Sequence, residues 1–271
     1  MRCAVLGDPI EHSLSPVLHR AGYAAVGLDW SYDPVRVDGA GLAAFLDGLD
    51  TDWRGLSLTM PLKRTVMPLA TSISDRARWV GAANTVVLTA DGGRHADNTD
   101  LPGAMAAVRE RYDGPVEAGA ILGGGATAAS TGLALCELGA REITVLARSP
   151  ERAEETRRVI AAHPAAPRVE VAGLDAVPVA DVLVSTVPVA AQTPEIVARW
   201  SNVAVVFEVV YDPWPTPFAS AAVSSGAVLV GGLDLLVHQA AIQFTAFTGV
   251  PAPLAAMRAA GEEALAARSR G

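Results

Sequence analysis

One lysine stands among the cations of this chain, at position 63 in the segment TMPLKRTVMP. Lysine and arginine together number 21, so every cation other than Lys63 is an arginine. A lysine ammonium can be shifted until it gives up a proton, whereas arginine stays charged at any workable pH. Lys63 is therefore a candidate for proton chemistry. Chance survival of one lysine in an arginine-biased, alanine-rich chain explains the same observation, so the residue type alone leaves both interpretations open.

A second polar cluster lies near the N-terminus, in GDPIEHSLSPVLH. Ser13 and Ser15 are two positions apart, so in extended chain both hydroxyls face the same side, where they could donate to a carboxylate. Ser15 also precedes Pro16 and is predicted to cap a helix with proline at its first position. The two roles are compatible, because anions are favoured at helix N-termini.

Further polar residues follow apolar runs in SLTMPLK, GAANTVV and ADNTDLPG. They are Thr59, Lys63, Asn84, Asn98 and Asp100. Open α/β sheets bind their ligands beyond the carboxyl ends of strands, which favours a ligand site here. Asn84 and Asn98 are equally compatible with turns, and Asp100 with a cap of the following helix.

A glycine-rich turn follows another apolar run, in AILGGGATAA. Gly123, Gly125 and Ala128 fit the pattern G-x-G-x-x-A between a predicted strand and a predicted helix. A side chain would block the tight turn and the approach of backbone N–H groups to a pyrophosphate at the helix N-terminus. The order strand, turn, helix and second strand therefore predicts a dinucleotide site.

The end of the second strand, in LARSPER, distinguishes NAD from NADP. NAD sites usually place an acidic residue there, whereas NADP sites offer arginine to the 2'-phosphate. Arg148 and Arg152 are present with no acid at the strand tip, which predicts NADP. Arg157 and Arg158 continue the basic face, but we interpret them as solvated helix charges offset by nearby glutamates.

The candidate site residues above follow the ends of predicted strands. Short strand-like runs alternate with helical segments almost throughout the sequence, and this pattern predicts an α/β fold. The first half contains the apolar runs RCAVLG, SYDPVRV, GLSLT and NTVVLT, and a turn at DGGR closes a predicted hairpin. From Ala118 onward, predicted strands and helices alternate in the order expected for a doubly wound nucleotide-binding unit. Two helical segments end the chain and are expected to pack back on the first domain. We therefore predict an N-terminal α/β substrate-binding domain (1–103 plus 234–271) and a Rossmann-type NADP-binding domain (104–233).

Composition limits the classes of function. The 271 residues are 51% hydrophobic and 18% charged, without an apolar run long enough to cross a bilayer. A net charge of −8 opposes non-specific binding to nucleic acid or anionic membranes. The apolar run in the first ten residues is too short for the hydrophobic region of a signal peptide. Cys3 and Cys136 fit reduced residues of the core better than a disulfide, so we expect a cytoplasmic protein.

The motifs together resemble the shikimate dehydrogenase family over nearly the whole chain. SLSP, LTMPLK, GAANT, DNTD, ILGGGATA, VYDPWPTP and GGLDLLVHQAA occur in the order and at the spacing of that family. Any one of them is a weak signal, but seven in order leave little room for coincidence. The resemblance implies reduction of 3-dehydroshikimate to shikimate with NADPH, in aromatic amino-acid and chorismate biosynthesis.

The resemblance also implies a role for each matching residue. On the substrate side it assigns the carboxylate to Ser13 and Ser15, the ring hydroxyls to Thr59, Asn84, Asp100 and Gln239, the lining to Tyr211, and catalysis to the pair Lys63 and Asp100. On the cofactor side it assigns Gly123, Gly125, Ala126, Thr127, Arg148, Arg152, Thr186 and Gly232. Gly232 is expected against the nicotinamide and Thr186 beside the adenosine half. No residue is assigned to a metal.

Several alternatives stay open at this stage. Asp234 stands where the family usually has glycine or a neutral residue, close to the expected nicotinamide contact. A quinate or quinate/shikimate dehydrogenase shares most of the motifs but commonly favours NAD, and Arg148 and Arg152 argue against it. A non-catalytic NADP-binding regulatory relative would not need both Lys63 and Asp100. The sequence does not decide whether Lys63 donates a proton or only stabilises charge, or whether the chain is a monomer or a homodimer.

Overall fold

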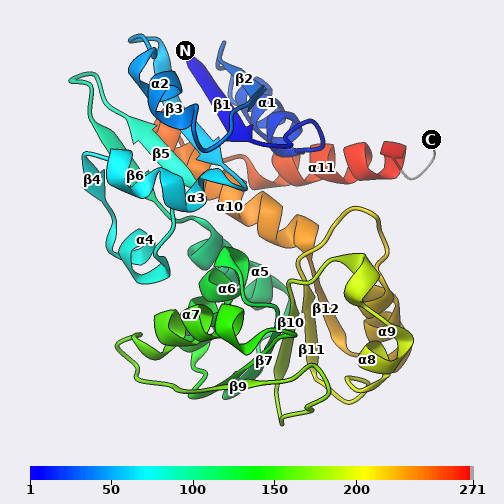
Figure 1. Cartoon of the computed structure of the whole chain (residues 1–271). Helices are drawn as coiled ribbons and strands as arrows, with labels where there is room; N and C mark the ends of the chain where they lie inside the picture. Colours follow the sequence, from blue (N-terminus) through cyan, green and yellow to red (C-terminus); the bar gives the residue numbers. More distant parts are fainter. Residues whose placement is uncertain (269–271) are drawn as a thin grey trace. The chain divides into compact units, whose positions relative to one another are not determined.

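The computed structural model describes residues 1–268, apart from the side chains of Pro150 and Arg152 (Figure 1). Chain contacts divide the protein into two units, Met1–Thr99 with Leu236–Gly271 and Asp100–Leu235. The first boundary falls directly before Asp100, and the second falls within helix α10 (Gly232–Thr248). The sequence assigns substrate binding to residues 1–103 plus 234–271 and dinucleotide binding to residues 104–233. This assignment stays a prediction.

The first unit contains a mixed sheet in the order β2-β1-β3-β5-β6-β4. Its strands are β1 (Arg2–Gly7), β2 (Ser31–Arg36), β3 (Trp53–Leu58), β4 (Ser72–Ile73), β5 (Thr85–Leu88) and β6 (Arg94–Asp97). β1 pairs in parallel with β2 and β3, whereas β5 runs antiparallel to β3 and to β6. The β5–β6 pairing confirms the hairpin predicted at DGGR. Apolar side chains from these strands, among them Leu6, Leu56 and Val86, are fully buried in the core.

Short and long helices complete the first unit. They are α1 (Ser15–Ala25), α2 (Leu42–Asp47), α3 (Leu62–Thr65), the 3-10 turn η1 (Met67–Leu69), α4 (Asp75–Val80), most of α10 and α11 (Leu254–Arg268). α11 packs against α1, which confirms that the C-terminal helices return to the first domain.

The start of α1 corrects one prediction. Leu14 is the N-cap residue, without a side-chain cap, and Ser15 is already the first residue of the helix. Ser15 therefore does not cap α1, because its own backbone is helical. The N–H of Ser15 donates a hydrogen bond of 3.3 Å to Ser13 Oγ.

The second unit contains an all-parallel sheet in the order β12-β11-β10-β7-β8-β9. Its strands are β7 (Ala118–Leu122), β8 (Glu142–Leu146), β9 (Arg168–Ala172), β10 (Val182–Ser185), β11 (Val205–Glu208) and β12 (Val228–Gly231). Its helices are α5 (Asp100–Arg111), α6 (Ala126–Leu138), α7 (Pro150–Ala161), the 3-10 turn η2 (Val189–Ala191), α8 (Pro194–Ala198), α9 (Pro217–Ser225) and the start of α10. This strand order confirms the predicted Rossmann-type fold, with its switch point between β7 and β10.

Within the described chain, no helix is both long enough and apolar enough to span a membrane.

Candidate active site

The loop after β3 positions Thr59 and Lys63. The N–H of Leu62 donates a 2.8 Å hydrogen bond to the carbonyl of Thr59, and the buried Leu62 and Val66 anchor α3 in the core. Lys63 lies between these two anchors and is half-buried. Its backbone carbonyl accepts from the N–H of Ala83 at 2.8 Å. The lysine is thereby fixed beside the segment that enters β5, one residue before Asn84.

The amide of Asn84 is held by a buried hydrogen-bond network. Its Oδ1 accepts from Thr85 Oγ1 at 2.8 Å, from the backbone N–H of Thr99 at 2.8 Å and from Thr99 Oγ1 at 3.1 Å. Its Nδ2 donates to Oε1 of Gln239 at 3.3 Å. The structure therefore brings Lys63, Asn84 and Gln239 together within the first unit from three separate segments of the chain.

Ser15 belongs to the same buried region, whereas Ser13 is half-buried at its margin. Tyr32, on β2, donates from its hydroxyl to Ser57 Oγ at 2.6 Å. Burial raises the pKa of Tyr32, while hydrogen bonds with Ser57 and with Ser15 act in the opposite direction. The phenol stays protonated at neutral pH and acts as a donor in this network.

The turn before Asp100 is fixed by a buried carboxylate. Asp97 Oδ1 accepts from the N–H of Asn98 at 2.8 Å and from Ser74 Oγ at 2.5 Å, and Arg76 holds both carboxylate oxygens. Asn98 Nδ2 donates to the carbonyl of Ala82 at 2.9 Å, so Asn98 acts as a turn residue. Burial opposes ionisation, but the hydrogen bonds from Arg76 and Ser74 hold the pKa of Asp97 below its ordinary value. Asp100 is buried and opens α5 as the first residue of the second unit.

In the second unit, the glycine-rich turn lies at the switch point of the sheet. Gly123 has a φ of +116°, and a Cβ there would lie 2.2 Å from Thr186 Oγ1, so only glycine fits. Thr186 Oγ1 donates to the carbonyl of Leu122 at 2.8 Å and ties β10 to β7. A Cβ on Gly125 would meet nothing within 4 Å, so the fold itself does not require glycine there.

The start of α6 offers hydrogen-bond donors to a phosphate group. Gly125 is its N-cap and no side chain caps it, and Ala126 and Thr127 supply the first helical N–H groups. The open space beside Gly125 together with these donors fits a pyrophosphate. The residues present therefore fit the dinucleotide that the sequence predicts.

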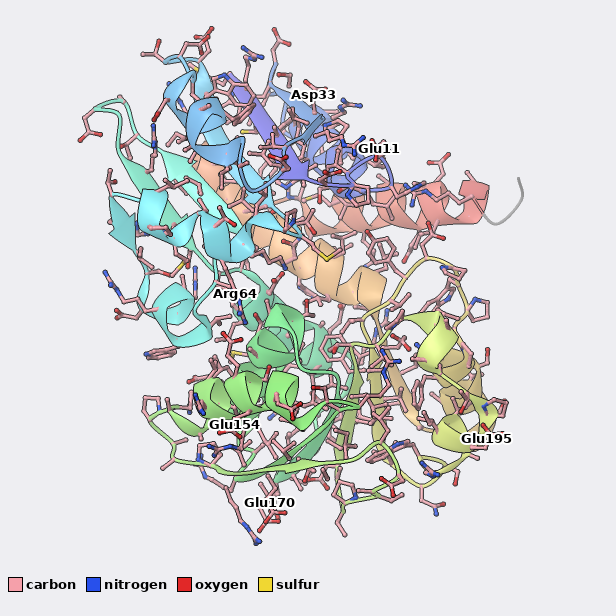
Figure 2. The ribbon with its side chains drawn as sticks, viewed as in Figure 1. Glu11, Asp33, Arg64, Glu154, Glu170 and Glu195 are labelled. Atoms are coloured by element: carbon pink, nitrogen blue, oxygen red, sulfur yellow. The ribbon has the colours of Figure 1, made fainter. Side chains whose placement is uncertain are left out.

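The arginines after β8 separate into two groups. Arg148 is exposed in the bend that follows the strand, and the side chain of Arg152 lies outside the described residues. Glu154, labelled in Figure 2, accepts from Arg157 Nε at 2.7 Å and from Arg158 Nε at 3.1 Å. The hydrogen bond from Arg157 is the chief cause that lowers the pKa of Glu154 to about 2. The interpretation of Arg157 and Arg158 as helix charges offset by glutamate is confirmed.

A second buried carboxylate fixes the loop that carries Tyr211. Glu208 ends β11, and its carboxylate accepts from the N–H of Val210 at 2.9 Å, from Gln192 Nε2 at 2.8 Å and from Thr216 Oγ1 at 3.1 Å. Burial raises the pKa of Glu208. Tyr211 follows Val210 directly and is half-buried. These bonds give the loop a defined backbone path on the carboxyl side of the sheet.

The turn between β12 and α10 is held by an ion pair. A Cβ on Gly232 would lie 2.2 Å from the carbonyl oxygen of Val209, so only glycine permits this close approach. The buried Asp234 accepts from the N–H of Gly231 at 2.9 Å and from Arg111 Nη2 at 2.8 Å. Asp234 therefore stabilises the backbone around Gly232, and no sequence motif indicates its partner Arg111.

Sequence reasoning also missed the polar residues that support Asn84. Those that hydrogen-bond to it are Thr85, Thr99 and Gln243. Behind them, Ser57 bonds to Gln243 and Tyr32 bonds to Ser57. One signal is present in the sequence, since Gln239 and Gln243 lie four positions apart in a largely apolar segment and share one face of a helix.

An all-parallel doubly wound sheet with a glycine turn at its switch point defines a dinucleotide-binding unit. The other unit adds a lysine beside buried amides, and a chain with both features is typical of a nicotinamide-nucleotide oxidoreductase. Models of the shikimate dehydrogenase substrate binding domain and the shikimate 5'-dehydrogenase C-terminal domain match residues 5–86 and 232–260. The shikimate dehydrogenase (NADP(+)) of Moorella thermoacetica is 34% identical over 99% of this chain and 95% of its own length. The chain belongs to the shikimate dehydrogenase family.

Two solved structures share its fold and nearly its full length. Mycobacterium tuberculosis shikimate dehydrogenase is 38% identical with a TM-score of 0.88, covering 97% of this chain and 99% of that one. Shikimate 5-dehydrogenase from Thermus thermophilus, solved in complex with NADP(H) and shikimate, is 28% identical with a TM-score of 0.87, covering 98% of this chain and 100% of that one.

Proposed function

We propose that the protein catalyses the reversible NADPH-dependent reduction of 3-dehydroshikimate to shikimate, in the pathway to chorismate and the aromatic amino acids. One observation in the first unit carries this proposal. Asn84 and Gln239, separated by 155 positions in the sequence, are hydrogen-bonded to each other directly beside the segment that fixes the backbone of Lys63. Two amides next to one lysine suit a ligand that carries ring hydroxyls and a reducible carbonyl.

The chemistry assigns a role to each group on the substrate side. Bound NADPH supplies the hydride for the carbonyl carbon. The carbonyl oxygen then gains negative charge, which Lys63 meets with a proton or with the charge of its ammonium. Asp100 orients the ammonium and accepts from a substrate hydroxyl. The other substrate residues hold the ligand in place: Thr59, Asn84 and Gln239 at the hydroxyls, Ser13 and Ser15 at the carboxylate, and Tyr211 along the ring.

The second unit would hold the dinucleotide. The pyrophosphate would meet the N–H groups of Gly125, Ala126 and Thr127, with Gly123 making the turn and Thr186 beside the adenosine half. Arg148 and Arg152 would bind the 2'-phosphate, and Gly232 would lie against the nicotinamide. The two free buried thiols, Cys3 and Cys136, support a cytoplasmic location.

The deciding experiment is an activity panel on the purified protein, with shikimate and quinate each tested against NADP and NAD. We expect turnover of shikimate with NADP. Preferred turnover of quinate with NAD would identify a quinate dehydrogenase instead. Binding of NADP without turnover of either substrate would identify a non-catalytic relative. Sedimentation of the same sample would decide between monomer and homodimer.

A further inference from the structure

We propose that Gln243 is a positioning residue that fixes the substrate-facing amide of Asn84 as a hydrogen-bond donor. The proposal rests on the proposed function, because Asn84 matters here as a ligand of the substrate. Gln243 is 1% exposed and lies on α10, one helical turn after Gln239.

A backbone carbonyl determines which way the amide of Gln243 points. Its Nε2 lies 3.1 Å from the carbonyl oxygen of Asn84, which can only accept. The nitrogen of Gln243 must therefore occupy this position, and the amide cannot be reversed without placing two acceptors against each other. Its oxygen then faces Ser57 Oγ, which donates to it at 2.8 Å.

This orientation passes to Asn84 through Thr85. Gln243 Nε2 also donates to Thr85 Oγ1 at 2.9 Å, so that hydroxyl accepts and directs its own proton to Asn84 Oδ1 at 2.8 Å. The backbone N–H of Thr99 reaches the same oxygen at 2.8 Å and can only donate. Asn84 Oδ1 is thus occupied by several donors, and the group that Asn84 directs away from them is its NH₂.

The far end of the network carries no charge. Tyr32 donates to Ser57, and the ring of His19 stacks on Tyr32 with 4.1 Å between ring centroids. Burial lowers the pKa of His19 to about 3, so this ring is neutral at neutral pH. The direction of each hydrogen bond from Tyr32 to Asn84 is therefore set by two backbone groups, the carbonyl of Asn84 and the N–H of Thr99, and does not depend on the charge of His19. A substrate hydroxyl at Asn84 must accept a hydrogen bond.

The test compares two variants that cut the network on opposite sides of Gln243. Gln243→Met keeps an unbranched side chain of similar length but removes the donor to Asn84 and Thr85. Ser57→Ala, the matched control, removes the bond to Gln243 Oε1 and the acceptor of the Tyr32 hydroxyl, but leaves the anchor at the Asn84 carbonyl intact. Thermal unfolding of both variants verifies that each is folded before kinetics are compared.

We expect Gln243→Met to raise the KM for shikimate about tenfold, the loss of roughly one well-oriented hydrogen bond, while kcat and the KM for NADP change about twofold or less. Ser57→Ala should keep the wild-type KM. Among ring-deoxy analogues of shikimate, the one that lacks the hydroxyl at Asn84 should bind wild type and Gln243→Met equally. A wild-type KM in Gln243→Met, or equal losses in both variants, would overturn the proposal.

A second measurement tests the positioning role of Gln243 without relying on enzyme turnover. In ¹⁵N NMR spectra of the ligand-free protein, the side-chain NH₂ signals of Asn84 are identified by their absence in Asn84→Asp. They should be sharp and slow to exchange in wild type and in Ser57→Ala, and broadened in Gln243→Met. Unchanged signals in Gln243→Met would contradict the positioning role. If wild type does not turn over shikimate, the proposed function fails, whereas this spectrum still answers for Gln243.

Discussion

Lys63 lies on a four-residue helix whose neighbouring side chains, Leu62 and Val66, are buried, so its backbone is fixed although the side chain is half-exposed. We expect Lys63→Met to lower kcat by about 10²- to 10⁴-fold, the usual cost of losing a positioned acid or base. Substrate affinity should fall much less, because the serines and amides remain. Lys63→Arg should also lower kcat, since arginine keeps the charge but does not readily release a proton.

Steady-state and equilibrium measurements on these variants separate the two roles of Lys63. Near-normal turnover in Lys63→Arg would exclude proton donation and leave charge stabilisation. Near-normal turnover in Lys63→Met would show that Lys63 is not needed for catalysis and that its presence reflects chance in an arginine-biased chain. As an independent check, an amine-selective reagent can modify only Lys63 and the N-terminal amine, and shikimate with NADP should protect Lys63 alone.

Arg148 is expected to decide the choice of cofactor, because it follows β8 where an NAD site would carry an acid. Arg148→Asp should weaken NADP binding by about 1.5–3 kcal/mol, the range for hydrogen bonds to charged groups, and NAD binding little. Its exposure places the expected effect toward the lower end of that range. Calorimetric titration with both cofactors measures the difference, and Arg158→Gln on α7 serves as a control. Equal losses for both cofactors would make Arg148 structural.

At the scale of elements, the turn between β12 and α10 is stabilised by one carboxylate. Asp234→Ala leaves the N–H of Gly231 without this acceptor and removes the partner of Arg111, so it should cost about 2–3 kcal/mol of unfolding free energy. Asp234→Asn keeps an acceptor for the N–H and should cost less. NADP binding should weaken in the same order, because Gly232 adjoins the turn. Urea unfolding and calorimetry on both variants test this order, and loss of stability without loss of NADP affinity would place Gly232 away from the cofactor.

Elements with a clear sequence signal, such as an apolar run or a glycine turn, could be predicted from the sequence, and very short elements could not. The central strands β7, β10 and β11 of the second unit are largely apolar runs because both of their faces are covered, and α6 follows a glycine turn that marks its start. In contrast, α3, α4 and α8 span only 4, 6 and 5 residues, too short to show a helical period. The N-cap of α1 was misplaced because proline is tolerated at either of the first helical positions, so Pro16 does not fix the boundary.

At the scale of the whole molecule, the motif residues of the site could be located in the sequence, but not the bonds that orient them. Asn84 and Gln239 were both singled out, whereas Gln243 was not, because its partners Ser57 and Thr85 lie far away in the chain. The same holds for Asp234 and Arg111, 123 positions apart. Polar contacts of this kind follow from tertiary packing, and local spacing carries no record of them.

Acid stability of the folded chain should depend on Asp97, since Arg76 and Ser74 lower its pKa from the ordinary 3.8. A carboxyl whose pKa is lower in the folded state stabilises the protein above the unfolded pKa and loses that contribution as the pH falls through the folded pKa. Asp97→Asn should therefore cost about 2 kcal/mol at pH 7, a value reduced from that of a fully buried pair because Arg76 is 36% exposed.

The difference between wild type and Asp97→Asn should shrink progressively as the pH is lowered below about 4, because protonation removes the same interaction from the wild type. Urea unfolding at a series of pH values measures it. Asp33→Asn is the matched control, since the carboxylate of Asp33 (Figure 2) pairs with Arg20 while more than half exposed. That control should stay within about 0.5 kcal/mol of wild type throughout. A difference for Asp97→Asn that stayed constant down to the acid transition would show that the asparagine disturbs the turn before Asp100 sterically, with no contribution from charge.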